Sequence, residues 1–517
     1  MSLSSLSLAM ALAASAATST PPTAPTVGAP TAPVDIDEVV EIDDGGARRR
    51  IERIDADTVR YIDVATGRRT IAGRSRTALV QVAAHDELGA VMARHGLGLV
   101  RAAMPSIGLY VVEDRARSDG VLLTERLQAT HDPALRLVFP NLAFAHTTHA
   151  SAADAGMAVP PDDTRYAAQW FLEEIGIEAA WQREAGDPDV VVAVVDNGCD
   201  VAHPDLVDKL EPGHDVVSDD DDPSHVSNAE GNNHGTACAG LIAASTDNDR
   251  DIAGACPLCR LRCTRLLPAG RELVPLDADV RAFDLAFEDD VDVINNSWGF
   301  IDAIPVPAAL AAAIEHVHDN GRGGLGAVVV FASGNDNREV GDDELLAVRG
   351  VIGVGAVNNL GELTQFSNRG RSVDIVAPTG TVATDVSGPG GDSDGDVTFR
   401  FGGTSSAAPL IAGIAGLLLA HDPTLTADEV AGVLEATAKQ SIFATPDADG
   451  HDVAYGWGLV QPAAALAALD DDGLPAPDDD DDVALGGGGC GCTASTSPAT
   501  VLWSLLVACA ALRRRQR

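Results

Sequence analysis

The sequence contains a carboxylate, an imidazole and a hydroxyl, each in a segment that could place it for joint chemistry. Asp196 directly follows the apolar run Val191–Val195, His234 opens a run of small residues, and Ser405 follows two glycines and a threonine. In this chemistry a hydroxyl attacks a carbonyl carbon, an imidazole takes the hydroxyl proton, and a carboxylate orients the imidazole. The order Asp, His, Ser is one in which such triads occur. We therefore predict acyl-transfer chemistry at Ser405.

Each of these residues also has an ordinary structural interpretation. An aspartate after a strand, or a serine after Gly-Thr, is most often a helix cap or a turn former, and a histidine at a helix start is commonly structural. Together, and in this order, the three residues favour catalysis. At a helix N-terminus, Ser405 would also lie beside free N–H groups and the positive end of the helix dipole, which favour developing negative charge.

The elements that must position the three residues follow from apolar runs between residues 163 and 469. Val190–Val195 and Ala327–Ala332 are short and continuously apolar, which is typical of buried parallel strands. His234–Ser245 and Ser405–His421 are apolar and rich in alanine, which is typical of buried helices. Strands and helices alternate through the region, so we predict a doubly wound α/β domain with a parallel sheet.

Residues 35–150 are predicted to form a separate, smaller unit ahead of that domain. Its second half has the order β-α-β-β-α-β, which is typical of a small ferredoxin-like α+β domain. The expected strands are Ala78–Val82, Gly98–Met104, Gly108–Asp114 and Leu135–Pro140, and the expected helices are His85–His95 and Val121–Ala129.

The composition argues against one class of partner. The chain has 77 acidic and 35 basic residues, a formal net charge of −42, whereas nucleic-acid binding needs a basic surface. We therefore expect no nucleic-acid partner. An acidic surface fits solubility, salt tolerance or calcium binding, and composition does not choose among these.

The eight cysteines fall into two groups. Five lie in the middle of the chain, and because that number is odd, at least one should be unpaired. Cys256 and Cys259 form a CxxC pair with no second pair or histidine cluster after it, which favours a local disulfide over a zinc site. The central group is Cys199, Cys238, Cys256, Cys259 and Cys263, and the other is Cys490, Cys492 and Cys509.

The two ends of the chain carry targeting signals. Residues 1–16 join an apolar run to a small-x-small pattern, which is typical of a secretory signal, although no Lys or Arg precedes the run. Residues 17–34 form a Pro/Thr-rich linker, and 470–489 form an acidic, Gly-rich spacer. Residues 490–517 include an uncharged stretch long enough to span a membrane, followed by arginines. We expect a secreted or cell-surface protein, initially tethered by this hydrophobic segment.

The segments around Asp196, His234 and Ser405 resemble the three signature blocks of the subtilase family, and the similarity runs through most of residues 163–469. The resemblance implies a subtilisin-like fold and a serine endopeptidase. Ser405 would then be the nucleophile, His234 the general base and acid, and Asp196 the orienting carboxylate. Asn335 resembles the side chain that donates a hydrogen bond to the oxyanion, together with the backbone N–H of Ser405.

The same resemblance implies a substrate-binding surface. Ser297, Trp298 and Gly299 resemble the strand that pairs with the main chain of the substrate, a β-augmentation mode. Ser333 and Gly334, which precede Asn335, are also expected to bind substrate.

Residues 35–150 resemble the inhibitory propeptide of the family, which assists folding and is removed by self-cleavage. Cleavage is expected within His146–Arg165. The alternative is an unrelated α/β domain.

Further features resemble the proteinase K and kexin-like branches. Cys238 lies one helical turn after the expected catalytic histidine, where those branches also have a cysteine, and a small buried filler is its expected task. Gln169–Leu172, Trp298 and Ala408–Leu410 resemble kexin and furin. On that match, Asp302 would be the acidic residue of the primary specificity pocket.

Two departures leave the specificity open. Asn197 follows the expected catalytic aspartate, where the convertases have a second aspartate, and Arg165 is the one basic residue in the expected processing window. Preference for basic residues and broad specificity therefore both stand as alternatives.

The resemblance also implies a metal and a sorting signal. Asp205 resembles a subtilase calcium ligand, and Asp247 lies in the loop that usually completes that site, so we expect structural calcium and no catalytic cofactor. Gly489–Cys492, the apolar segment and the terminal arginines resemble the C-terminal sorting tag of myxobacterial surface proteins. This implies a sorting machinery as a partner, and an ordinary tail anchor is the alternative.

The sequence thus predicts a monomeric endopeptidase, made as a self-processing zymogen, whose partners are protein and peptide substrates and its own propeptide. The alternative is a catalytically silent, subtilase-fold surface protein that binds peptides. A decayed enzyme should have lost one of Asp196, His234, Ser405 or Asn335, and all four are present. A lipase-like hydrolase would need Gly-x-Ser-x-Gly and the order Ser, Asp, His, which this chain lacks.

Overall fold

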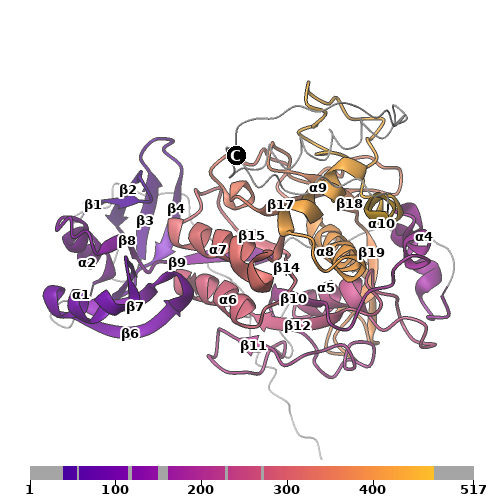
Figure 1. Ribbon diagram of the computed structural model, residues 1–517, viewed down its shortest axis with the longest axis horizontal. Helices are drawn as coiled ribbons and strands as arrows, with labels where there is room; N and C mark the ends of the chain where they lie inside the picture. Colours follow the sequence, from indigo (N-terminus) through magenta and orange to yellow (C-terminus); the bar gives the residue numbers. More distant parts are fainter. Residues whose placement is uncertain are drawn as a thin grey trace, which may run out of the picture.

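The computed structural model describes residues 39–54, 58–114, 119–148, 161–226, 231–268 and 273–470. The signal, linker, spacer and sorting segment predicted at the two ends lie outside these residues. The described chain forms an α/β domain and, to one side of it, two antiparallel sheets built mainly from the N-terminal part (Figure 1).

Seven parallel strands make the central sheet, in the order β11-β12-β10-β14-β16-β17-β18. The chain starts at β10, adds β11 and β12 on one side, and then crosses to β14 on the other. Ligands of such sheets bind at the carboxyl ends of the strands, where the order reverses. The doubly wound parallel sheet predicted from the sequence is confirmed. The strands are Val191–Asp196 (β10), His214–Asp215 (β11), Arg260–Arg265 (β12), Val293–Asn296 (β14), Val328–Ala332 (β16), Val351–Val357 (β17) and Ile375–Pro378 (β18).

Helices cover both faces of this sheet because successive side chains of a buried strand point to opposite faces. Val192 and Val194 of β10 pack in one apolar core with helices α5 (His234–Ala243) and α8 (Thr404–His421). Ala193 and Val195 pack in the other core with α6 (Leu276–Glu288) and α7 (Ala308–Gly324), which is interrupted at residues 321–323. Among the described helices, α8 alone is long and apolar enough to cross a membrane, but it is mostly buried and is a core helix here.

The N-terminal part contains the predicted ferredoxin-like order. Its four-stranded antiparallel sheet has the order β6-β7-β5-β8. Asp119 caps the second helix, since its carboxylate accepts hydrogen bonds from the N–H groups of Val121 and Leu122. The elements are Thr77–Val82 (β5), Leu88–His95 (α1), Leu97–Met104 (β6), Leu109–Asp114 (β7), Gly120–Gln128 (α2) and Leu135–Pro140 (β8).

A second antiparallel sheet, which the sequence analysis did not predict, precedes the ferredoxin-like unit. Its first hairpin turns at Gly45 and Gly46, both with positive φ, as a tight two-residue turn requires. Gly45 also lies against the α/β domain, where an added Cβ would come within 2.9 Å of the Ala308 Cβ. The strands are Val39–Asp44 (β1), Ala47–Arg53 (β2), Thr58–Asp63 (β3), Arg69–Gly73 (β4) and Ala143–Thr148 (β9), joined by Leu273–Pro275 (β13) and Trp298–Phe300 (β15).

The other described elements complete the edges of the α/β domain. They are the helices Trp170–Glu174 (α3), Ile177–Trp181 (α4), Ala427–Thr437 (α9) and Pro462–Asp470 (α10), the antiparallel pair Thr381–Thr384 (β19) and Val397–Phe401 (β20), and short 3-10 turns at His85–Glu87, Pro105–Ile107, Tyr166–Ala168 and Leu345–Ala347.

Two disulfides join four of the five described cysteines. Cys199 pairs with Cys263 across 64 residues, and Cys256 pairs with Cys259. Cys238 is free and buried. The predictions of a local disulfide in the CxxC segment and of an unpaired central cysteine are confirmed.

The longer disulfide should contribute more stability, because it removes more loop-closure entropy from the unfolded chain. Replacing Cys199 and Cys263 by Ala should lower the free energy of unfolding by about 4 kcal/mol, and replacing Cys256 and Cys259 by about 2 kcal/mol. Equilibrium denaturation in a Ser405→Ala background, which prevents self-digestion, measures both. Equal losses from the two pairs would contradict the loop argument.

Candidate active site

The three residues of the predicted triad meet at the carboxyl edge of the sheet. Asp196 is the last residue of β10, His234 is the first residue of α5, and Ser405 is the second residue of α8. This edge is where the strand order reverses, so two helices can begin beside one strand end. All three side chains are buried.

The Asp196 carboxylate holds the His234 imidazole. The Nδ1 atom of His234 lies 2.8 Å and 2.9 Å from the two carboxylate oxygens. This contact fixes the proton on Nδ1 and leaves Nε2 with the lone pair that a general base needs. The approach depends on Gly235, where a Cβ would collide with the carbonyl oxygen of Gly198. Asn197 also holds the start of α5 near the end of β10, because its side-chain oxygen accepts a hydrogen bond from the N–H of Gly235 at 3.0 Å.

The Ser405 hydroxyl is oriented by Ser297, which lies between β14 and β15. It donates to the carbonyl oxygen of Ser297 at 3.1 Å, and the Ser297 hydroxyl donates in return to the Ser405 carbonyl oxygen at 3.2 Å. The Nε2 atom of His234 has no hydrogen-bond partner within the described chain. In substrate-free hydrolases the serine–histidine bond is often absent or long and tightens when substrate binds.

Asn335 lies beside the N-terminus of α8. Its side-chain oxygen accepts hydrogen bonds from the backbone N–H and the hydroxyl of Thr404, at 3.0 Å and 3.2 Å. The oxygen end of the amide therefore points to α8, and the NH2 end is the one that can donate to a developing oxyanion. Gly334, which precedes it with φ of +98°, donates its N–H to the Thr404 hydroxyl at 3.1 Å.

The strand β15 already pairs with an extended segment. Gly299 lies opposite Thr147 in antiparallel register, and Trp298 lies opposite Thr148. The preceding residues of the same segment, β9, pair with β13 of the α/β domain, where Val274 lies opposite Phe144. Ser297, Trp298 and Gly299 thus form a sheet edge that can hold a peptide main chain by β-augmentation.

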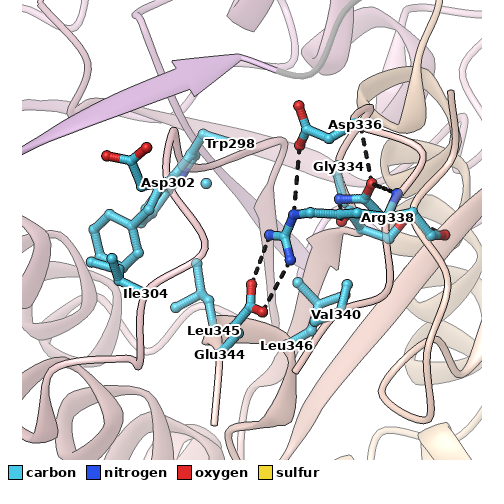
Figure 2. A pocket seen from close by; sticks show the side chains of 15 residues that line it. Trp298, Asp302, Ile304, Gly334, Asp336, Arg338, Val340, Glu344, Leu345 and Leu346 are labelled. Atoms are coloured by element: carbon cyan, nitrogen blue, oxygen red, sulfur yellow. Dashed lines mark hydrogen bonds and ion pairs between the residues drawn. The ribbon is translucent and has the colours of Figure 1, made fainter. Parts of the chain in front are cut away.

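One pocket unites the other predicted substrate residues. Asp302, Ser333 and Gly334 line it together with Trp298 and Gly299 (Figure 2). It also contains charged residues that sequence reasoning missed, namely Asp336, Arg338 and Glu344. They follow the Asn335 block in an irregular segment, so no periodicity signalled them.

Cys238 lies beside Asp196 and His234. Its sulfur is close to Asp196 and His234 and donates to the carbonyl oxygen of Ser405 at 3.6 Å. Burial, and then the charge of Asp196, raise the pKa of the Cys238 thiol well above its usual range. The side chain is therefore a neutral, small filler, as the sequence analysis expected.

The two predicted calcium ligands, Asp205 and Asp247, contact different groups. Asp205 accepts hydrogen bonds from the Asn248 side chain at 2.8 Å and from the Ile252 N–H at 3.2 Å. Asp247 instead groups with Asp162 and Asp163, whose carboxylates sequence reasoning missed.

This region has the chemistry of a hard-cation site. A carboxylate oxygen of Asp163 and one of Asp251 are buried with no hydrogen-bond partner in the described residues. Burial raises the pKa of Asp205 to about 6 and raises the pKa of Asp163. Calcium is bound by six to eight oxygen atoms, so carboxylates that burial destabilises in the ionised form fit such an ion.

Residues 187–458, which include Asp196, His234 and Ser405, match the model of the subtilase family. The chain belongs to the subtilase family. It is 26% identical over 422 residues to the Calcium-dependent protease of Nostoc sp., covering 73% of this chain and 60% of that protein. It is 32% identical over 318 residues to the Halolysin-like extracellular serine protease Nep of Natrialba magadii, covering 60% of this chain and 54% of that protein.

Among solved structures, fervidolysin from Fervidobacterium pennivorans has the same fold. The two superpose with a TM-score of 0.60 at 22% identity, over 84% of this chain and 65% of fervidolysin. The likeness extends beyond the 187–458 match, so it includes much of the N-terminal part. The subtilase resemblance inferred from the signature blocks is confirmed by these comparisons.

Proposed function

We propose that this chain is a serine endopeptidase that hydrolyses peptide bonds in proteins. The observation that carries the proposal is the buried contact between Asp196 and Nδ1 of His234, at 2.8 Å and 2.9 Å, beside Ser405 at the start of α8. Membership of the subtilase family supports it, and so does a relative named as a serine protease.

In the proposed mechanism, Ser405 gives its proton to Nε2 of His234 as its oxygen attacks the substrate carbonyl. The oxyanion is stabilised by the Ser405 backbone N–H and the Asn335 amide, and losing such a donor costs roughly 3–4 kcal/mol. His234 then protonates the leaving amine, and Asp196 stabilises the imidazolium. Water reverses these steps to release the acyl group. Burial strengthens each interaction, because few solvent dipoles compete with it.

The chain is further proposed to be made as a zymogen. Strand β9 pairs with β13 through residues 143–145 and with β15 through residues 146–148, and so takes the edge of β15 that a substrate would use. The N-terminal part is also tied to α6, where the Asn141 amide donates to Asp277 at 2.9 Å and accepts the Asp277 N–H at 3.2 Å. Substrate can bind only after this segment is cut and displaced.

The full chain and its Ser405→Ala variant test both proposals. The wild type should release an N-terminal fragment ending within His146–Arg165 and then cleave a mixed peptide library. The variant should remain uncut, and its peptidase activity should fall by a factor on the order of 10^5. Intact mass and peptide mass spectrometry follow the two reactions. Ser441→Ala, which changes a serine distant from the triad, is the matched control and should process normally.

If folded wild type neither matures nor cleaves any peptide, the endopeptidase proposal is wrong, and the peptide-binding alternative replaces it. If the Ser405→Ala variant is cut at the same place without added protease, another residue or protein performs the processing.

We also propose structural calcium, held by the buried Asp163 with Asp162 and Asp247 at the surface and with Asp205 and Asn248 beside them. The ion supplies positive charge to carboxylates that burial otherwise disfavours. It takes no part in the proposed chemistry. A relative named as a Calcium-dependent protease supports the proposal.

Calcium removal should therefore destabilise the chain. At 100 times its dissociation constant, the ion should add about 2.7 kcal/mol to the free energy of unfolding. The stability that calcium adds should be smaller at pH 5 than at pH 7.5. Burial raises the pKa of Asp205 to about 6, so at pH 5 this carboxyl is mostly protonated and the folded state needs the positive charge of the ion less. Thermal unfolding of Ser405→Ala protein in calcium or chelator measures this.

In the same assay, Asp163→Asn should remove at least half of the calcium effect. Asp208→Asn, which changes a nearby exposed carboxylate, should leave it unchanged. A calcium effect equal in both variants would contradict the assigned ligands.

The proposed location is outside the cytoplasm, secreted or tethered to the cell surface. Two disulfides favour an oxidising compartment, and one relative is named as extracellular. The signal at residues 1–16, the tail at 490–517 and its sorting machinery rest on the sequence alone.

A further inference from the structure

The pocket beside β15 is placed to receive a substrate side chain. It is lined by Trp298 and Gly299, which pair with the β9 main chain, and by Ser333 and Gly334 (Figure 2). The N–H of Gly334 donates a hydrogen bond to the hydroxyl of Thr404, the residue before Ser405. A peptide held on β15 with its scissile carbonyl at Ser405 therefore has a side chain at the mouth of this pocket.

A guanidinium lies across this pocket. Arg338 reaches from the segment after Gly334 to the opposite wall, where it makes two parallel hydrogen bonds with Glu344, at 2.7 Å and 3.0 Å (Figure 2). Such bidentate pairs are the strong form of the arginine–carboxylate interaction. The Glu344 carboxylate also accepts the Gly341 N–H at 2.8 Å.

Glu344 is the carboxylate of the pocket that could bind a cation strongly. It is 7% exposed, whereas Asp302 and Asp336 are exposed and therefore screened by water and salt. Arg338 already neutralises Glu344. The rest of the lining is mixed. Apolar side chains (Trp298, Ile304, Val340, Leu345 and Leu346) lie beside polar ones (Ser333, Asn368 and the exposed Asp302 and Asp336).

The unprocessed chain places a second arginine on Glu344, from outside the pocket. Arg68, which directly precedes β4, donates a hydrogen bond to the Glu344 carboxylate at 3.1 Å and forms an ion pair with Asp343. Arg68 is not among the residues that line the pocket. Thr70 of the same sheet donates to Asp302. Both contacts belong to the N-terminal part and are lost with it, while the pair of Arg338 and Glu344 belongs to the catalytic domain and stays.

We propose that Arg338 determines the primary specificity of the proposed peptidase. By neutralising Glu344, the buried carboxylate of the pocket, it selects peptide bonds that follow an uncharged, apolar residue and disfavours those that follow Lys or Arg. The inference rests on the proposed function. It favours cleavage after apolar residues over the preference for basic residues that the sequence left open. On this proposal, Asp302 has only a minor effect on which residue precedes the cut bond.

The test compares three peptides that differ only in the residue before the cut bond, which is Leu, Arg or Glu. For the mature wild type, kcat/KM should be at least tenfold higher for the Leu peptide than for the Arg peptide. In Arg338→Met, Glu344 loses its partner, so the Leu-to-Arg ratio should fall at least tenfold. In Glu344→Gln, Arg338 keeps only one ion pair among the described residues, a long one with the exposed Asp336 at 3.9 Å, so cleavage after Glu should rise at least tenfold relative to Leu.

A matched variant controls for nonspecific effects. Arg371→Met removes a surface arginine that pairs with Asp447 at 2.8 Å, and it should keep the wild-type ratios. Asp302→Asn tests the exposed carboxylate of the pocket itself, and because water and salt screen that group, it should change the Leu-to-Arg ratio less than threefold. Because each ratio is measured within one preparation, partial misfolding of a variant does not alter it.

The proposal is overturned if mature wild type cleaves the Arg peptide as well as the Leu peptide. It is also overturned if Arg338→Met and Glu344→Gln cleave the Leu peptide but keep the wild-type ratios. If wild type cleaves no peptide at all, the endopeptidase proposal itself fails, which is a different result from an altered preference.

Discussion

The contact between the Asp196 carboxylate and the His234 imidazole is the interaction on which the rest of the site depends. It requires a strand end and a helix start to approach closely, which Gly235 permits because a Cβ there would strike the Gly198 carbonyl. The reversal of strand order at β10 leaves room at the same edge for α8, which begins with Thr404 and Ser405. The parallel sheet therefore brings together residues that lie more than two hundred positions apart in sequence.

The surface that would bind substrate is also the surface on which the N-terminal part is held. Strand β9 pairs with β13 and, further along the chain, with β15, as a bound peptide would. Arg68 and Thr70 from the second antiparallel sheet contact Glu344 and Asp302 of the adjacent pocket. The proposed inhibition and the proposed specificity thus depend on neighbouring groups. On these proposals, removal of the N-terminal part frees the sheet edge and leaves Arg338 paired with Glu344.

Residues in regular, apolar elements were predictable from the sequence, and residues that depend on tertiary contacts were not. The runs around Val192 and Ser405 predict a buried strand and a buried helix, because continuous apolar character requires burial on all sides. The sheet of β1–β4 was missed, since Asp44, Asp63 and Arg49, which pairs with both aspartates, occupy buried positions where a strand pattern would have apolar residues. Arg338 pairs with Glu344, and Asp163 lies beside Asp247, only because irregular segments fold together, and neither pairing has a sequence period.

The most direct test of the account is covalent labelling of the mature protein with an organophosphorus fluoride, followed by peptide mapping. Such a reagent reacts with a serine hydroxyl only when a neighbouring base activates it. The account predicts a single modified residue, Ser405, and loss of the modification in a His234→Ala variant that remains folded. Labelling at another serine, or equal labelling of Ser405 without His234, would contradict the assignment of Asp196, His234 and Ser405 as one catalytic unit.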